Sequence, residues 1–498
     1  MKKFIALFLS LLMLIPVLAA CSDKKPSDTN DTDPPAESSA DTVAETQRVD
    51  DNGYLLDDLP ETLNFGNKKF LIVCWDEQMK TEFDTEDNSV ELIPNAINRR
   101  NQVTEQRLGV DLEFYGIKGN NSNRNSFIEA VSNSITTNAH EYDMVAAYSM
   151  CSASLSIKGC NLDLRSLDYL DFAKPWWPQR LTDEATVNDK LYFASGDIST
   201  NLLWSMLLMI YSKDMLAQYN IPDDLAKKVN NGEWTLDVLF DLSSNVSGDI
   251  DGVEGKSDGD RFGFTTSNVY SDAFFFASGL RTVERTETGV TQIAESFGSE
   301  KTHTLISRLN TFFDSENANF YTSNYSNATY FSEGKSLFEL RPTYYIRDYL
   351  AGSSVKYGVL PAPKYDTDQE SYVTTVGFTY TLYSVPADAA DADMSAAVLE
   401  CMASEAYRKT TPALFEIALK VRYSSDPESA LMFDTIRNGI SFDLGRIFCL
   451  EFTGKTKYAT YNMFRYALVD RSNSWMSTYA EEKSILENTL NSIVSALE

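Results

Sequence analysis

An alternation of strand-like and helix-like segments early in the chain limits the possible folds more than any other feature. Phe70 to Trp75 is a short apolar run typical of a buried strand, and residues 89–107 place apolar side chains at helical spacing. Residues 110–114 alternate like a strand, residues 127–137 favour a helix, and residues 142–147 favour a third strand. This order predicts a parallel sheet covered by helices, and therefore an α/β fold.

The chain is too long to enclose a single hydrophobic core. It has 498 residues, and single cores stop growing well below that length, so we expect two lobes. Residues 393–420 and 481–498 add two long helical patterns late in the sequence. No internal repeat of about 20 to 50 residues is visible, which argues against a solenoid.

The N-terminal residues 1–20 have the features of a secretory signal peptide. Lys2 and Lys3 precede an apolar stretch, Phe4 to Ala20, that is short for a stable membrane span. Leu18-Ala19-Ala20-Cys21 resembles the lipobox of bacterial lipoproteins, which implies cleavage before Cys21 and acyl lipid such as palmitate on that residue. The alternative is an ordinary secretory signal followed by an incidental cysteine.

Residues 21–53 are predicted to form a disordered acidic tether that starts at the lipidated cysteine. After Cys21 they contain no aromatic residue, Leu, Ile or Met, and acids outnumber bases. A flexible chain of this length reaches on the order of 30 Å. We therefore expect a protein held on the cell membrane by lipid, at the extracellular face of a Gram-positive-type cell or in a periplasm.

The charge balance excludes several classes of partner. Lys and Arg number 43 and Asp and Glu 72, which gives a formal net charge of −29. Nucleic-acid binding needs a basic stripe, so no nucleic-acid partner is expected. Only 2 His are present, which disfavours a His-rich metal site and a His-dependent catalytic triad.

Common catalytic motifs do not support an enzyme. Three Gly-Lys-Ser/Thr triplets, at 255–257, 334–336 and 454–456, mimic the end of a phosphate loop but lack the glycine five positions before the last one. HExxH and GxSxG do not occur. We therefore expect no enzymatic activity, although 72 acids leave a carboxylate-pair glycosidase open as an alternative.

The remaining cysteines give no sign of a metal or redox motif. No CxxC is present, so zinc and thioredoxin-type sites have no support. Cys151 and Cys160 are near enough in sequence to pair in an oxidising compartment, and two free thiols are the alternative. The five cysteines after the lipobox are Cys74, Cys151, Cys160, Cys401 and Cys449.

Eight short motifs follow one another between residues 142 and 364. They are Tyr142–Val145, Lys158-Gly159 with Asp163-Leu164, Lys190–Ala194, Ile210–Leu216, Glu233–Leu239, Asp258–Phe264, Phe331–Phe338 and Tyr357–Lys364. Together they resemble, in the same order, motifs of the extracellular solute-binding proteins of bacterial ABC importers, of the sugar-binding type related to maltose-binding protein. Each motif alone is weak, and the shared order carries the resemblance.

This resemblance implies a two-lobe periplasmic-binding-protein fold of type II, with a ligand cleft between lobes joined by crossing strands. Lobe 1 would comprise residues 54–197 and 378–430, and lobe 2 residues 200–374 and 431–498. The crossings would fall near residues 195–203, 374–380 and 430.

Ligand-binding residues are expected where strands end and where the chain crosses between lobes. A sugar site stacks an aromatic ring on the apolar face of the sugar and aims polar groups at its hydroxyls. Tyr344 aligns with a stacking tryptophan of the family, so we predict that it is a stacking platform on lobe 2. For each aromatic candidate the alternative is packing in the core. The candidates are Trp75, Asp76, Tyr148, Ser149, Trp204, Arg341, Tyr344, Tyr345 and Phe378.

Asp249, Asp251 and Asp260 resemble part of a calcium loop. An EF-type loop needs oxygen ligands at positions 1, 3, 5 and 12 and glycine at position 6. Counting from Asp249, position 5 is Val253, position 6 is Glu254 and position 12 is Asp260, so two key places depart from the pattern. The alternative is a solvated turn, and no other metal or cofactor is expected.

The resemblance implies a monomeric, membrane-anchored binding protein that captures a carbohydrate, such as an oligosaccharide, and delivers it to the permease of an ABC importer. A glycan sensor or adhesion lipoprotein with the same fold but no transport role is the alternative. Neighbouring permease genes would separate these two, and glycan hydrolysis by the purified protein would identify a glycosidase.

Overall fold

The structure, a computed structural model, describes residues 48–85, 91–322, 329–424, 426–455 and 460–498. The signal segment, Cys21 and most of the predicted tether lie outside the described residues. Among the described helices, none is both long enough and apolar enough to cross a membrane.

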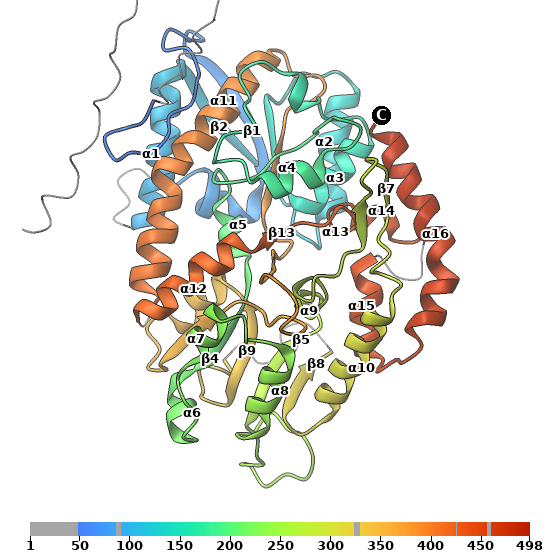
Figure 1. Ribbon diagram of the computed structural model, residues 1–498. Helices are drawn as coiled ribbons and strands as arrows, with labels where there is room; N and C mark the ends of the chain where they lie inside the picture. Colours follow the sequence, from blue (N-terminus) through green and yellow to red (C-terminus); the bar gives the residue numbers. More distant parts are fainter. Residues whose placement is uncertain (1–47, 86–90, 323–328, 425, 456–459) are drawn as a thin grey trace, which may run out of the picture. The chain divides into compact units, whose positions relative to one another are not determined.

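The first sheet, in the upper part of Figure 1, has the strand order β12-β3-β1-β2. Strand β1 is parallel to both β2 and β3, and β12 runs antiparallel to β3. Helix α1 links β1 to β2 and α2 links β2 to β3, which is the strand–helix alternation that the sequence predicted. The bounds are β1 Lys68–Trp75, α1 Leu92–Leu108, β2 Val110–Ile117, α2 Arg124–Thr136, β3 Met144–Tyr148 and β12 Thr381–Ser384.

The end of α1 illustrates why these elements begin and end where they do. Gly109 follows the helix in the left-handed conformation, with φ of 59°, and its N–H donates to the carbonyl of Glu105. Glycine adopts this conformation without a Cβ penalty, so the helix ends there and β2 begins at the next residue.

The second sheet, in the lower part of Figure 1, has the order β10-β4-β9-β5-β8. Strand β5 is parallel to β8 and β9, whereas β4 is antiparallel to β9 and β10. Its strands are β4 Leu207–Ser212, β5 Phe262–Ser267, β8 Ala318–Tyr321, β9 Ser336–Pro342 and β10 Tyr357–Leu360. Both sheets combine with helices, so the predicted α/β class is confirmed.

Short pairings join the segments that run between the two sheets. Strand β11 (Thr374–Thr375) is parallel to β13 (Ile440–Ser441), and a single bridge pairs Met206 with Val376. Because these pairings are so short, few backbone hydrogen bonds hold the connection.

One predicted helix is interrupted. The pattern over residues 393–420 becomes α11 (Ala392–Glu405) followed by two π-helical segments, η5 (Ala406–Thr410) and η6 (Pro412–Arg422). Proline cannot donate an N–H and clashes with the preceding turn, so Pro412 disfavours a regular α-helix there. The second late helix, α16 (Trp475–Ala496), begins earlier than the pattern predicted.

The remaining elements are short, apart from α10. They are η1 Asp76–Gln78, η2 Met79–Phe83, α3 Ser149–Ile157, η3 Leu164–Ser166, α4 Gln179–Ala185, α5 Thr200–Trp204, α6 Lys213–Gln218, α7 Leu225–Asn230, α8 Leu236–Ser244, α9 Asp272–Ala277, β6 Val283–Arg285, β7 Thr291–Ile293, α10 Glu300–Asp314, η4 Ile346–Leu350, α12 Pro427–Asn438, α13 Leu444–Ile447, α14 Cys449–Phe452 and α15 Thr460–Val469.

All five described cysteines are buried and unpaired. Cys151 and Cys160 are therefore free thiols in this structure, which agrees with the second of the two alternatives that the sequence left open.

Candidate functional site

A small cavity lies where the connecting segments meet between the two sheets. Its volume is about 20 Å³, enough for roughly one water molecule. A sugar ring is much larger, so these walls would have to separate to admit one. The lining residues are Ser149, Phe276, Thr375, Val376, Phe378, Tyr380, Ser441, Phe442, Asp443, Arg446 and Ile447.

Arg446 on α13 lines the cavity and joins several parts of its wall. Its Nη1 donates to the carbonyl oxygen of Val376 at 2.6 Å, and its Nε donates to Oδ2 of Asp272 at 3.0 Å. The centre of its guanidinium lies 3.8 Å from the centroid of the Phe378 ring, which is a close cation–π contact. The side chain therefore ties α9 to the segment that leads from β11 towards β12.

Asp272, at the start of α9, is the anion of this cluster. It is completely buried and also accepts hydrogen bonds from Nη2 and Nε of Arg465, at 2.6 and 3.1 Å. Burial alone would raise the pKa of Asp272, but the charges of Arg465 and Arg446 outweigh it and hold the pKa below its ordinary value. The carboxylate is therefore ionised at neutral pH and needs both guanidiniums.

Aromatic rings continue the cluster away from the cavity. The ring centroids of Phe378 and Tyr461 are 5.0 Å apart, and the guanidinium of Arg465 lies 4.6 Å from the Tyr461 ring. The two aromatic rings therefore lie in a row between two cations, in the order Arg446, Phe378, Tyr461 and Arg465. Such a wall offers apolar faces and fixed charges together, which is the combination that a carbohydrate site uses.

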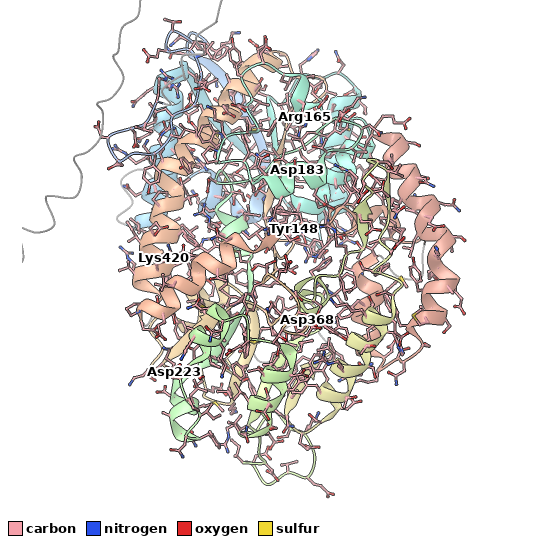
Figure 2. All side chains as sticks on the ribbon, viewed as in Figure 1. Tyr148, Arg165, Asp183, Asp223, Asp368 and Lys420 are labelled. Carbon is pink, nitrogen blue, oxygen red and sulfur yellow. The ribbon has the colours of Figure 1, made fainter. Side chains whose placement is uncertain are left out.

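Trp75 and Tyr148, predicted at the ends of β1 and β3, pack against each other. Tyr148 lies between the two sheets (Figure 2), and its ring centroid is 5.4 Å from that of Trp75. Trp75 is 1% exposed, and its Nε1 donates to Oγ1 of Thr381 at 2.9 Å. Ser149 donates to the carbonyl oxygen of Phe378 at 2.7 Å, whereas Asp76 is exposed.

The hydroxyl of Tyr148 is buried. Burial raises the pKa of its hydroxyl well above the ordinary value, and Cys449 and Tyr461 add to the increase while Arg446 opposes it. Of the predicted residues, Ser149 and Phe378 line the small cavity, and Tyr148, next to Ser149 in the chain, packs against Trp75.

The other predicted residues form a second group beside β9. Arg341 is 3% exposed, and its Nε donates to Oε1 of Glu339 at 2.7 Å. Its guanidinium lies 4.9 Å from the ring of Tyr345, which is itself only 2% exposed. Trp204 is also buried, beneath the guanidinium of Arg347 at 4.8 Å.

Tyr344 differs from these neighbours because it is only half-buried. Its hydroxyl lies 3.4 Å from that of Tyr270, in the segment that precedes Asp272. None of this second group lines the small cavity. The stacking role of Tyr344 stays a prediction.

The charged residues of the site, Asp272 and Arg446, were not predicted from the sequence. Asp272 precedes the apolar run Ala273–Ala277, and Arg446 lies next to Ile447 and Phe448. A charged residue beside an apolar run is buried only when it is paired, so this pattern was an available signal.

Comparison with known proteins supports the fold. No family model and no curated protein matches the chain. A solved cyclo/maltodextrin-binding protein, in complex with maltotetraose, is 15% identical with a TM-score of 0.55, and the match covers 86% of this chain and 98% of that one.

Two further solved structures carry different ligands. The galacto-N-biose/lacto-N-biose I-binding protein of an ABC transporter from Bifidobacterium longum, in complex with lacto-N-biose, is 10% identical with a TM-score of 0.54 over 87% of this chain and 99% of that one. UgpB from Mycobacterium tuberculosis, in complex with glycerophosphocholine, is 12% identical with a TM-score of 0.54 over 86% and 99%. At this identity the likeness shows the fold, and the predicted two-lobe binding-protein fold of type II is confirmed.

Proposed function

We propose that this chain is a membrane-anchored extracellular substrate-binding protein that captures a carbohydrate, such as an oligosaccharide, and delivers it to an ABC importer. The observation that carries the proposal is the wall of rings and paired charges around the central cavity, in the fold that holds maltotetraose and lacto-N-biose in solved proteins.

The chemistry of this wall suits a neutral, hydroxyl-rich ligand. The Phe378 ring is half-buried, and polar groups of Ser149, Tyr380 and Asp443 surround the same cavity. Aromatic faces can cover the apolar side of a pyranose while polar side chains bind its edge hydroxyls. The buried charges are already paired with each other, so they favour an uncharged ligand over an anion.

The mechanism is hinge closure with no covalent step. The cavity of about 20 Å³ is too small for a sugar, and only short pairings hold the connecting segments. Ligand entry would therefore separate the two sheets, and closure would bury the ligand and present a loaded surface to a permease. The protein acts as a monomer without enzymatic activity.

The lipid anchor forms part of the proposal. Cys21 would carry the lipid and hold the protein at the outer face of the cell membrane or in the periplasm. Cys21→Ala should release the protein from washed membranes without changing ligand affinity, and retention of this variant would contradict the anchor.

A thermal-shift screen tests ligand capture most directly. The panel should contain maltotetraose, lacto-N-biose, other neutral oligosaccharides and glycerophosphocholine. A ligand at 100 times its Kd should stabilise the protein by about 2.7 kcal/mol. Stabilisation by glycerophosphocholine alone would overturn the carbohydrate assignment.

One substitution tests the predicted stacking platform. Tyr344→Ala should weaken the Kd roughly tenfold to a hundredfold, because stacking is lost, and should lower the apo melting temperature little. Tyr349→Ala is a matched control, since Tyr349 lies in the next helical turn and is 42% exposed. Unchanged affinity in a folded Tyr344→Ala protein would contradict the platform.

A further inference from the structure

A loop far from the central cavity gathers three carboxylates. Residues 249–260 connect α8 to β5 at the bottom of Figure 1, and Gly248 pairs with Arg261 at the base of the loop. Asp249, Asp251 and Asp260 each present a carboxylate oxygen, and these oxygens all lie within 4.8 Å of one another.

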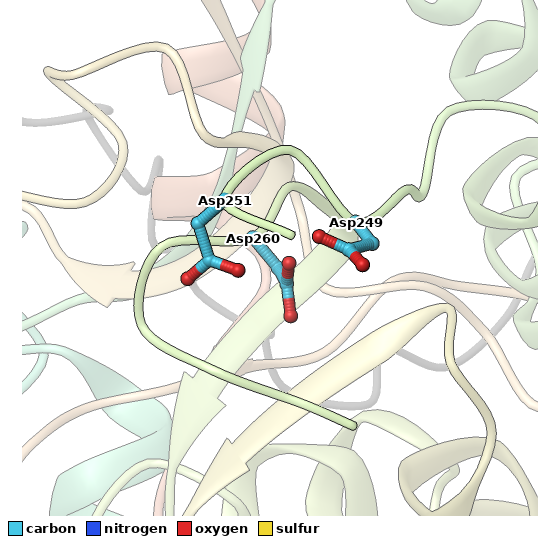
Figure 3. Close-up of side chains that lie close together, drawn as sticks. All are labelled: Asp249, Asp251 and Asp260. Atoms are coloured by element: carbon cyan, nitrogen blue, oxygen red, sulfur yellow. The ribbon is translucent and has the colours of Figure 1, made fainter. Parts of the chain in front are cut away.

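Asp260 points into this cluster from the protein interior. Figure 3 shows its carboxylate between those of Asp249 and Asp251. The residue is 4% exposed, and its Oδ2 accepts the N–H of Ser257 at 2.8 Å. Its Oδ1 is buried and has no hydrogen-bond partner among the described residues. A buried carboxylate oxygen without a donor is costly unless something outside the chain binds it.

The loop backbone passes close to the carboxylate of Asp251. A Cβ atom placed on Gly259 would lie 2.0 Å from Oδ2 of Asp251, so only glycine lets this carboxylate approach so closely. The hydroxyl of Ser257 and the N–H of Val253 also donate to Asp251, and they fix the orientation of its carboxylate.

Nearby basic side chains do not neutralise the cluster. Lys256 lies in the same loop, but its Nζ donates to the carbonyl oxygens of Phe313 and Ala318, at 2.9 and 3.1 Å. The Nε of Arg261 donates to the carbonyl oxygen of Val246 at 3.0 Å. Within the described part of the chain, no salt bridge involves any of the three aspartates.

We propose that Asp249, Asp251 and Asp260 bind one calcium ion. Calcium takes six to eight oxygen ligands in flexible geometry, so three carboxylates with loop carbonyls and water can satisfy it. Magnesium needs near-ideal octahedral geometry, and zinc prefers nitrogen and sulfur ligands, which this cluster does not offer. The ion would fix the loop between α8 and β5 and would not touch the central cavity.

Isothermal titration of the EDTA-treated protein with calcium chloride tests the site without any sugar. We expect one saturable site per chain, with a Kd of about 10⁻⁴ to 10⁻³ M, the range of extracellular modules. Asp260→Asn should weaken binding at least about tenfold, because it removes the inward ligand. If that variant does not fold, as judged by circular dichroism, Asp249→Asn at an exposed position serves the same purpose.

Asp258→Asn is the matched control, because it removes the same charge from the same loop. Oδ1 of Asp258 accepts the hydroxyl of Tyr321 at 3.2 Å, and Asp258 is not part of the cluster. Its calcium Kd should stay within about a factor of three of the wild-type value. The proposal is overturned by the absence of saturable binding, by equal affinity for magnesium, or by equal losses in Asp258→Asn and Asp260→Asn.

Discussion

Two buried carboxylates in different regions of the molecule are stabilised in opposite ways. Asp272, beside the central cavity, accepts hydrogen bonds from the guanidiniums of Arg446 and Arg465. Glu400, on α11, instead accepts the indole N–H groups of Trp176 and Trp177, at 3.1 and 2.9 Å. Both are almost fully buried, with exposures of 0% and 1%, so burial does not explain the difference.

The difference appears in the pKa values. At Asp272, burial raises the pKa, but two full positive charges outweigh it and the pKa falls below its ordinary value. At Glu400, burial raises the pKa to about 8, because the bond from Trp177 is weaker than burial and the charge of Asp57 adds to the increase. At Glu400 the two indole N–H groups therefore do not compensate for burial, whereas at Asp272 the two guanidiniums do.

Removing the anion beside the cavity should have the largest effect. Asp272→Asn leaves two buried guanidiniums without their counter-charge, so we expect a loss of about 3–5 kcal/mol in the free energy of unfolding, measured with urea. Asp237→Asn is the control, because its ion pair with Arg308 is on the surface and the Asp237 side chain is 77% exposed. That variant should lose no more than about 1 kcal/mol. Equal losses in both variants would contradict the comparison.

Glu400→Gln should change how stability depends on pH. The folded pKa of about 8 lies above the ordinary value of 4.5, so the folded state keeps a proton that the unfolded state has lost. The contribution of Glu400 to the free energy of unfolding should therefore fall as pH rises from 4.5 to about 8. Glutamine cannot ionise, so Glu400→Gln should remove this pH dependence.

Urea unfolding of wild type and Glu400→Gln at pH 5 and pH 8 measures this effect. The difference between the two proteins should shift by about 2–4 kcal/mol in favour of the variant at pH 8. Parallel pH profiles would show that Glu400 is ionised in the folded protein.

Asp272 should contribute a pH dependence of stability with the opposite sign, and at lower pH. Its folded pKa lies below the ordinary 3.8, so its contribution is complete above that value and is lost as pH falls through the folded pKa. Wild type should therefore lose its advantage over Asp272→Asn as pH is lowered below about 4, by about 1–2 kcal/mol. An advantage that stays constant down to pH 2.5 would contradict the pairing.

Replacing the ring under Arg446 should have the smallest effect. Phe378→Leu removes the aromatic face 3.8 Å from the guanidinium, and such a contact contributes about 0.5–2 kcal/mol. A double-mutant cycle with Asp272→Asn should show a coupling above about 0.5 kcal/mol, because both residues hold Arg446. Strict additivity would mean that the ring and the carboxylate act independently.

Local patterns predicted most of the first sheet and its helices. The apolar run at Phe70 and the helical spacing before Gly109 lie within one segment each, so neighbouring residues were enough to identify β1 and α1. The interruption after Glu405 was missed, because the apolar spacing continues through the π-helical turns while the backbone hydrogen bonds change.

The candidate site was only partly predictable for a different reason. Ser149 and Phe378 could be placed, because strand ends and crossings follow from the order of elements. The charged cluster could not, since Asp272 meets Arg446 across 174 residues and Arg465 across 193 residues. Nothing in the local sequence identifies which distant arginine neutralises a given aspartate.

The contacts that close the central cavity also set a threshold for binding. Arg446 already holds the Val376 carbonyl and the face of Phe378, so any ligand competes with contacts that the protein makes with itself. If only about one molecule in a hundred is open, the apparent affinity is about a hundredfold weaker than the intrinsic one. Weakening the hydrogen bond from Arg446 to the Val376 carbonyl would raise the population of open molecules. A less stable protein would then bind its ligand at a lower ligand concentration. Under the proposed function, the ligand concentration needed for half-saturation would thus depend on a contact that the ligand itself need not touch.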